Sequence, residues 1–112
     1  MSILIEITGS LIEEEIFKQL NRFGWSQIIE NGKTYYALFK SIMINGKSKD
    51  VEAFRWEYTY APLKMVFQSC VLPKGVTTRT GNTVLRVLAG KITSDLISND
   101  CLNIKMYRIS FQ

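Results

Sequence analysis

Hydrophobic residues recur at every second position over much of this chain, which is the period of a β-strand with one buried face. Ile3, Ile5 and Ile7 show the pattern first and predict a strand over residues 3–8. Similar runs predict further strands over residues 26–30, 34–44, 54–60, 63–71, 83–93 and 102–111. Residues 11–23 differ, because Ile12, Ile16, Leu20 and Phe23 follow the spacing of one helix face and end at Gly24.

The segments between these runs have the composition of turns. Asn31-Gly32 and Asn45-Gly46 predict tight hairpins, since both residue types tolerate positive φ angles. Residues 46–50, 73–75 and 77–82 predict exposed loops. Gly9 and Gly90 stand late in predicted strands, where a barrel strand must bend. Strands do not alternate with helices, so we expect a single domain over residues 1–112 that is mainly β, built as a small antiparallel barrel or sandwich.

Four aromatic residues occupy alternate positions of one predicted strand: Phe54, Trp56, Tyr58 and Tyr60. Side chains two apart point to the same face of a strand, so the four rings share one face. Such a face is either a wall of the core or a platform on which unpaired bases stack. The alternation leaves both interpretations open.

Composition argues against several classes of enzyme. The chain has no histidine, so Ser/His and Cys/His nucleophile–base pairs are excluded. Cys70 and Cys101 are 31 residues apart without a CxxC motif, and no phosphate loop or dinucleotide fingerprint occurs. We therefore expect no enzyme, no metal and no cofactor. We also expect a soluble cytoplasmic protein with no membrane partner, because no signal peptide and no apolar run of roughly 18–20 residues is present.

Net charge is distributed unequally. The chain carries +4 in total. Residues 1–30 contain five acids and two bases, which gives −3, whereas residues 31–112 contain twelve bases and five acids, which gives +7. A basic body of this kind favours a polyanionic partner such as nucleic acid. The alternative is a basic surface that serves only solubility.

Three segments resemble, in order, the OB-fold single-stranded DNA-binding protein family, including its primosomal replication protein N branch and phage- or plasmid-borne versions. They are residues 3–11, with the late Gly9-Ser10-Leu11, residues 31–39, which begin Asn31-Gly32, and residues 81–92. The resemblance implies a five-stranded OB-like barrel with one short helix. It also implies single-stranded DNA binding in replication or recombination, a homodimer or homotetramer, and a replication-protein partner. RNA remains open as the ligand. The helical segment 11–23 and the end of the chain without an acidic tail depart from the family pattern.

Single-strand binding needs rings that meet bases and cations that follow phosphates. The resemblance places Trp56 where the family has a base-stacking tryptophan, with Phe54 and Tyr58 on the same face. The full set of candidate nucleic-acid-binding residues is Trp56, Phe54, Tyr58, Arg55, Lys47, Lys49, Tyr36, Arg79, Arg86 and Lys91. The alternative function is a small phage- or plasmid-encoded interaction module or inhibitor, with the same aromatics as interface hot spots. A further alternative is a structural subunit that adds its edge strands to a homo-oligomer.

Overall fold

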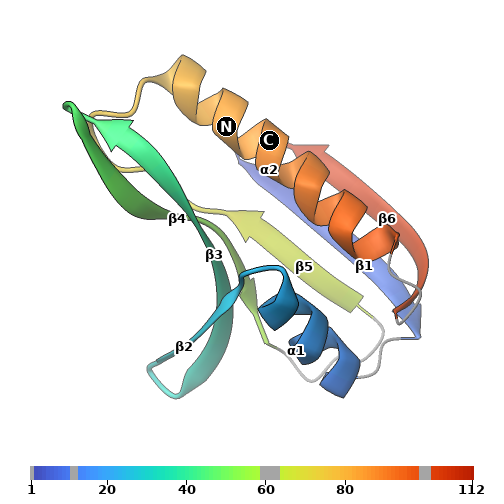
Figure 1. Ribbon diagram of the computed structural model, residues 1–112. Coiled ribbons are helices and arrows are strands. Elements are labelled where there is room, and N and C mark those ends of the chain that lie inside the picture. The colour runs from blue at the N-terminus through green and yellow to red at the C-terminus, as the bar shows by residue number, and fades with distance from the viewer. Residues whose placement is uncertain (1, 11–12, 59–63, 99–101) are drawn as a thin grey trace.

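The computed structural model describes residues 2–10, 13–58, 64–98 and 102–112 as one antiparallel sheet of six strands with two helices (Figure 1). In chain order the elements are β1 (Ile3–Ser10), α1 (Glu13–Arg22), β2 (Ser26–Glu30), β3 (Lys33–Ile44), β4 (Lys47–Glu57), β5 (Lys64–Ser69), α2 (Thr78–Ile97) and β6 (Asn103–Phe111). The strands lie in the order β2-β3-β4-β5-β1-β6, so β2 and β6 are the edges.

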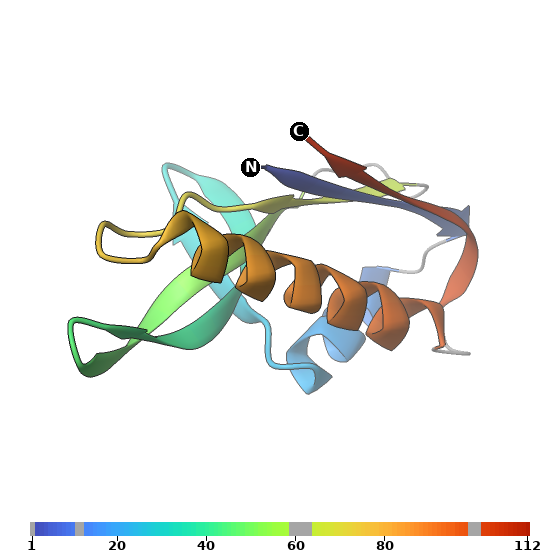
Figure 2. The same ribbon diagram turned by 90° about the horizontal axis from the view of Figure 1, so that it is seen from above.

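Both helices pack on the same side of the sheet (Figure 2). The core lies between them and the sheet, and its β1 members are Ile3, Ile5 and Ile7, each fully buried. This confirms the strand and the buried face that alternation predicts for residues 3–8. The opposite face of the sheet carries no helix among the described residues.

The local predictions that rest on turn chemistry and helical spacing are confirmed. Asn31 and Asn45 have φ angles of 52° and 51°, and the glycines that follow them also have positive φ, as a tight hairpin requires. The predicted helix 11–23 is α1, with Ile16 and Leu20 buried. Ile12, Leu11 and Tyr60 lie outside the described residues. The predicted loop 46–50 is instead mostly the start of β4.

The closed five-stranded barrel is wrong, because the sheet is open and has six strands. The expected strand 83–93 and loop 77–82 are also wrong, since both fall almost entirely within α2. Leu85, Leu88, Ala89, Ile92 and Leu96 form the buried stripe of that helix. Gly90 is therefore an exposed helical residue rather than a barrel corner, and a mainly β chain with antiparallel pairing is what remains of the fold prediction.

The loop between β5 and α2 has little space beside Gly75. Gly75 has a φ angle of +99°, and a Cβ atom there would lie 2.8 Å from Cγ2 of Ile44, a buried residue. We expect Gly75→Ala to lower the free energy of unfolding by about 1–3 kcal/mol, as measured by urea denaturation. Gly90→Ala is the control, because open space surrounds that position and alanine favours a helix by about 0.5–1 kcal/mol. Equal stabilities for the two variants would contradict the packing of this loop.

Candidate nucleic-acid interface

The aromatic face of β4 belongs to the core. Phe54 is fully buried and Trp56 is only 3% exposed, while Tyr58 is half-buried and packs against the same cluster. Tyr36, on the neighbouring β3, is also buried. These four candidates therefore point toward the helices, and their burial corrects the expectation that they form an exposed stacking platform.

Ring contacts fix these side chains. Trp56 and Tyr36 stack with their centroids 5.5 Å apart, and Phe17 of α1 stacks on Tyr36 at 5.2 Å. Phe17 also meets Tyr58 edge-on at 5.2 Å, and Phe67 of β5 lies 5.9 Å from Trp56. Helix α1 thus covers the aromatic face of β3 and β4, which a base would need to reach. Alternation shows which side chains share a face of a strand, but it does not show which face a helix covers.

Two of the candidate cations have carboxylate partners. Arg55 donates to both Glu52 oxygens and to Glu30 at 3.1 Å, and these carboxylates raise the pKa of the guanidinium further above its usual range. Lys91 contacts Asp95 one helical turn away at 2.8 Å. Because their charges are already compensated, neither residue is well placed to attract phosphate.

The β3–β4 hairpin positions the lysines that remain. Lys47 and Lys49 pair across the ladder with Ile44 and Ile42, which are buried on the helix side of the hairpin. Lys40, two residues before Ile42, has the same orientation. These three exposed lysines therefore emerge on the helix side of the sheet.

A small apolar cluster joins the hairpin to the start of α2. Ile42, Ile44 and Val51 are its buried members, with Leu72, Val76 and Val84 packed against them. Helix α2 begins at Thr78 after its N-cap Thr77, whose side chain accepts from the Thr80 N–H. The cluster therefore holds the basic hairpin beside the first turns of α2.

Helix α2 continues the row of cations. Arg79 and Arg86 are seven residues apart, so they lie on nearly the same side of the helix, about two turns or 10 Å apart. Lys74 stands in the exposed loop just before. We call the set of these cations the basic strip: Lys40, Lys47, Lys49, Lys74, Arg79 and Arg86.

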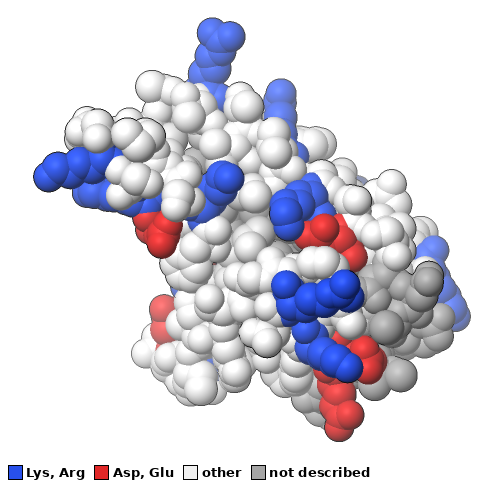
Figure 3. All heavy atoms as spheres, in the orientation of Figure 1, with Lys and Arg blue, Asp and Glu red and all other residues white. Residues whose placement is uncertain are grey.

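The basic strip accounts for the net charge of the protein. Residues 40–50 and 72–90 contain its six bases and one acid, Asp50, which gives +5. The rest of the chain contains the other eight bases and nine acids, which gives −1. Figure 3 shows Lys and Arg side chains projecting around the hairpin and the first turns of α2, while toward α1 the Lys and Arg side chains lie beside Asp and Glu. The positive potential is therefore concentrated at one end.

Two exposed rings of β6 lie on the same side of the sheet as the strip, and they were not among the residues predicted from the sequence. Tyr107 and Phe111 lie four residues apart in β6, opposite Ile7 and Ile3, and thus point to the helix side. They are 50% and 57% exposed, and the guanidinium of Arg86 lies 5.9 Å from the ring centre of Phe111. Their spacing in an alternating strand was the available signal.

The thiol that the structure describes, Cys70, follows the last residue of β5. Burial raises the pKa of Cys70 to about 12, so its thiol is protonated at neutral pH and is a poor nucleophile. Within the described part of the chain, no three His, Cys, Asp or Glu side chains gather as a metal site would require. No helix of that part is long and apolar enough to cross a membrane.

Comparison with known proteins identifies no relative. No family model, no curated protein and no solved structure matches this chain. The functional argument therefore depends on the residues and geometry described above.

Proposed function

We propose that this protein binds single-stranded nucleic acid without catalysis, and that the strand lies across the basic strip. The observation that carries the proposal is the concentration of six cations and one acid at one end of a molecule whose remainder is nearly neutral. Clustered cations bind phosphates by releasing condensed counterions, and they accelerate the encounter with a polyanion. Single-stranded DNA is the expected ligand, as it was from the sequence.

The preference for a single strand rests on Tyr107 and Phe111. Unpaired bases stack on exposed rings with a gain of roughly 1–3 kcal/mol per base, whereas the bases of a duplex are already stacked and paired. Arg86, in contact with Phe111, places a cation beside one ring. In this proposal Lys47, Lys49, Arg79 and Arg86 keep the phosphate-binding role expected from the sequence. The base-stacking role that the sequence suggested for Trp56 is assigned to Tyr107 and Phe111 instead.

Fluorescence anisotropy with a labelled oligo-dT tests this function. A strand of about 30 nucleotides spans more than the ~4–16 nucleotides that one small domain covers. If all six cations meet phosphates, the affinity should fall roughly 300-fold between about 50 and 200 mM salt, since the slope for single strands is about −0.7 per contact. A duplex of the same length should bind more weakly. Equal affinity for the duplex would contradict the preference for a single strand. No binding of oligo-dT at low salt would contradict the proposed function itself.

A protein-docking role is the second candidate, and the edge strand β6 favours it. The sheet order leaves one side of β6 without a neighbouring strand among the described residues, and Met106 is exposed beside Tyr107. Such an edge can accept a strand from a partner or from a second copy of the chain. Binding through this edge would depend on main-chain hydrogen bonds and on contacts with uncharged side chains, and would therefore change little with salt.

A further inference from the structure

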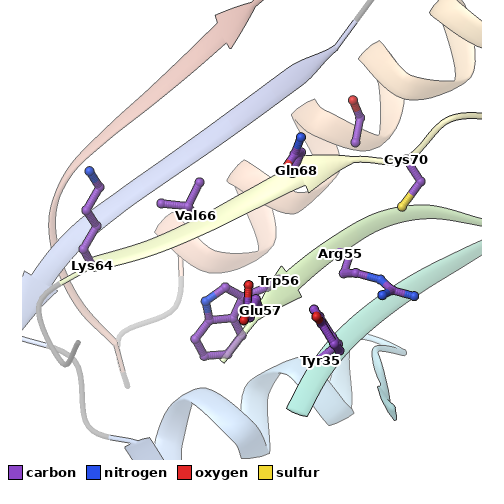
Figure 4. Close-up of a pocket in the computed structure, with 9 residues that line it drawn as sticks. Tyr35, Arg55, Trp56, Glu57, Lys64, Val66, Gln68 and Cys70 are labelled. Carbon is purple, nitrogen blue, oxygen red and sulfur yellow. The ribbon is translucent and has the colours of Figure 1, made fainter. Parts of the chain in front are cut away.

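A gap opens in the sheet between β4 and β5. Phe54 pairs with Ser69 and Arg55 with Gln68, and the Cys70 N–H donates to the Ala53 carbonyl at 2.8 Å. Among the described residues the β4–β5 ladder has only these two residue pairs, whereas β5 pairs with β1 over residues 64–68 along its other edge. A cavity of about 420 Å³ fills the gap, with the indole of Trp56 among its lining groups (Figure 4). Its volume falls within the ~300–1,000 Å³ range of small-molecule sites.

This cavity is separate from the basic strip. Arg55 and Gln68 alternate with the buried residues of their strands, so they line it from the face of the sheet that is opposite the helices. The basic strip and the two rings of β6 lie on the helix side. A ligand in the cavity would therefore not touch the basic strip or the two rings of β6.

One wall of the cavity is formed by two planar groups, the Arg55 guanidinium and the Tyr35 ring. The guanidinium of Arg55 lies 4.5 Å from the centre of the Tyr35 ring, and both side chains line the cavity (Figure 4). Glu52 and Glu30 hold the N–H edge of the guanidinium, which fixes the orientation of its plane. A planar guanidinium held in this way stacks well on another planar ring. Because carboxylates engage three of the five N–H groups and offset the positive charge, the wall offers a stacking surface rather than a binding site for an anion.

The other lining groups favour an uncharged ligand that has a hydrogen-bonding edge. Lys64 faces Glu6 at 3.8 Å, and Glu57 faces Lys33 at 3.3 Å, so the charges at the rim are compensated. The amide of Gln68 offers both a donor and an acceptor, while Val66 supplies apolar surface. Burial keeps the Cys70 thiol neutral as well.

We propose that this cavity binds one uncharged, planar heteroaromatic ring of the purine-base class. The ring stacks on the Arg55–Tyr35 wall and directs its polar edge toward Gln68. The site is independent of the basic strip, so the ligand is a free base or nucleoside rather than part of the bound strand.

Adenosine, an uncharged purine nucleoside, is the probe for the experiment, with binding followed by isothermal titration calorimetry at millimolar ligand. The wild-type protein should bind it. Val66→Trp fills the cavity and should abolish the heat of binding, whereas Met43→Trp should bind like the wild type. Met43 is the matched control, because it is exposed on the same face of the sheet but does not line the cavity.

Arg55→Lys keeps the positive charge but removes the plane, and it should weaken adenosine binding about tenfold. Urea denaturation establishes that each variant is folded, and oligo-dT binding by the Val66→Trp protein should remain at the wild-type level. This last measurement separates the cavity from the basic strip. No binding of adenosine by the wild-type protein, or unchanged binding by Val66→Trp, would overturn the proposal.

Discussion

Replacing Trp56 with alanine is expected to lower the free energy of unfolding by about 3–5 kcal/mol, the usual cost of removing a large buried aromatic side chain. Trp56 is 3% exposed and contacts Tyr36, Tyr58 and Phe67 at centroid distances of 5.5–5.9 Å. The substitution leaves a cavity at the centre of this aromatic cluster. Urea denaturation followed by circular dichroism measures the loss.

Phe111→Ala is the matched control for this prediction, because it removes a ring that is more than half exposed. We expect it to change the free energy of unfolding by about 1 kcal/mol or less. It should instead weaken oligo-dT binding by about 1–3 kcal/mol, the value of one stacked base. A Trp56→Ala protein with wild-type stability and lost oligo-dT binding would restore Trp56 as a base-stacking residue and contradict the core assignment.

Local chemistry in the sequence predicted the elements that depend on few neighbours. The two Asn-Gly hairpins were predictable because positive φ angles are a property of those residue types. The buried face of β1 was predictable because its three isoleucines alternate. In each case the structural outcome follows from residues a few positions apart.

Helix α2 shows why the second half of the fold was mispredicted. Residues 83–93 contain short apolar runs that fit a strand, and their glycine and β-branched residues lower helix propensity. The helical stripe of Leu85, Leu88, Ala89 and Ile92 lies within the same residues, but Val84 and Val87 fall outside it and make the run look continuously apolar. These residues form a helix that packs on the sheet, so the expected barrel strand at 83–93 is absent, and the six strands present form an open sheet.

The candidate site was predicted in part for a similar reason. Alternation showed that Phe54, Trp56 and Tyr58 share a face, but it carried no information on which face α1 covers. Lys47, Lys49 and Arg79 were predicted to be exposed loop residues, and Arg86 a strand residue. Their common surface with Arg86 exists because an apolar cluster holds the hairpin beside α2, a contact between segments far apart in the chain.

Neutralising three cations of the basic strip is expected to have the largest effect on binding. The triple variant Lys47→Gln, Lys49→Gln, Arg79→Gln removes three of six proposed phosphate contacts. The slope of log affinity against log salt should therefore decrease in magnitude by about 2, from about −4. The three side chains are exposed, so the fold should be unaffected.

The control changes net charge by the same amount elsewhere. In the triple variant Lys18→Gln, Lys33→Gln, Lys64→Gln, three exposed lysines outside the strip are neutralised. Two of them, Lys33 and Lys64, face Glu57 and Glu6. Because these positions lie away from the hairpin and α2, the slope should stay near that of the wild type. The comparison separates a located interface from a general effect of net charge.

The most direct test of the nucleic-acid interface is the salt dependence of oligo-dT affinity for the wild-type protein and these two triple variants, measured side by side by fluorescence anisotropy. Binding across the basic strip predicts that the slope becomes shallower by about 2 in the strip variant and is unchanged in the control. Equal slopes in the two variants would contradict the assignment of the interface to the β3–β4 hairpin and the first turns of α2.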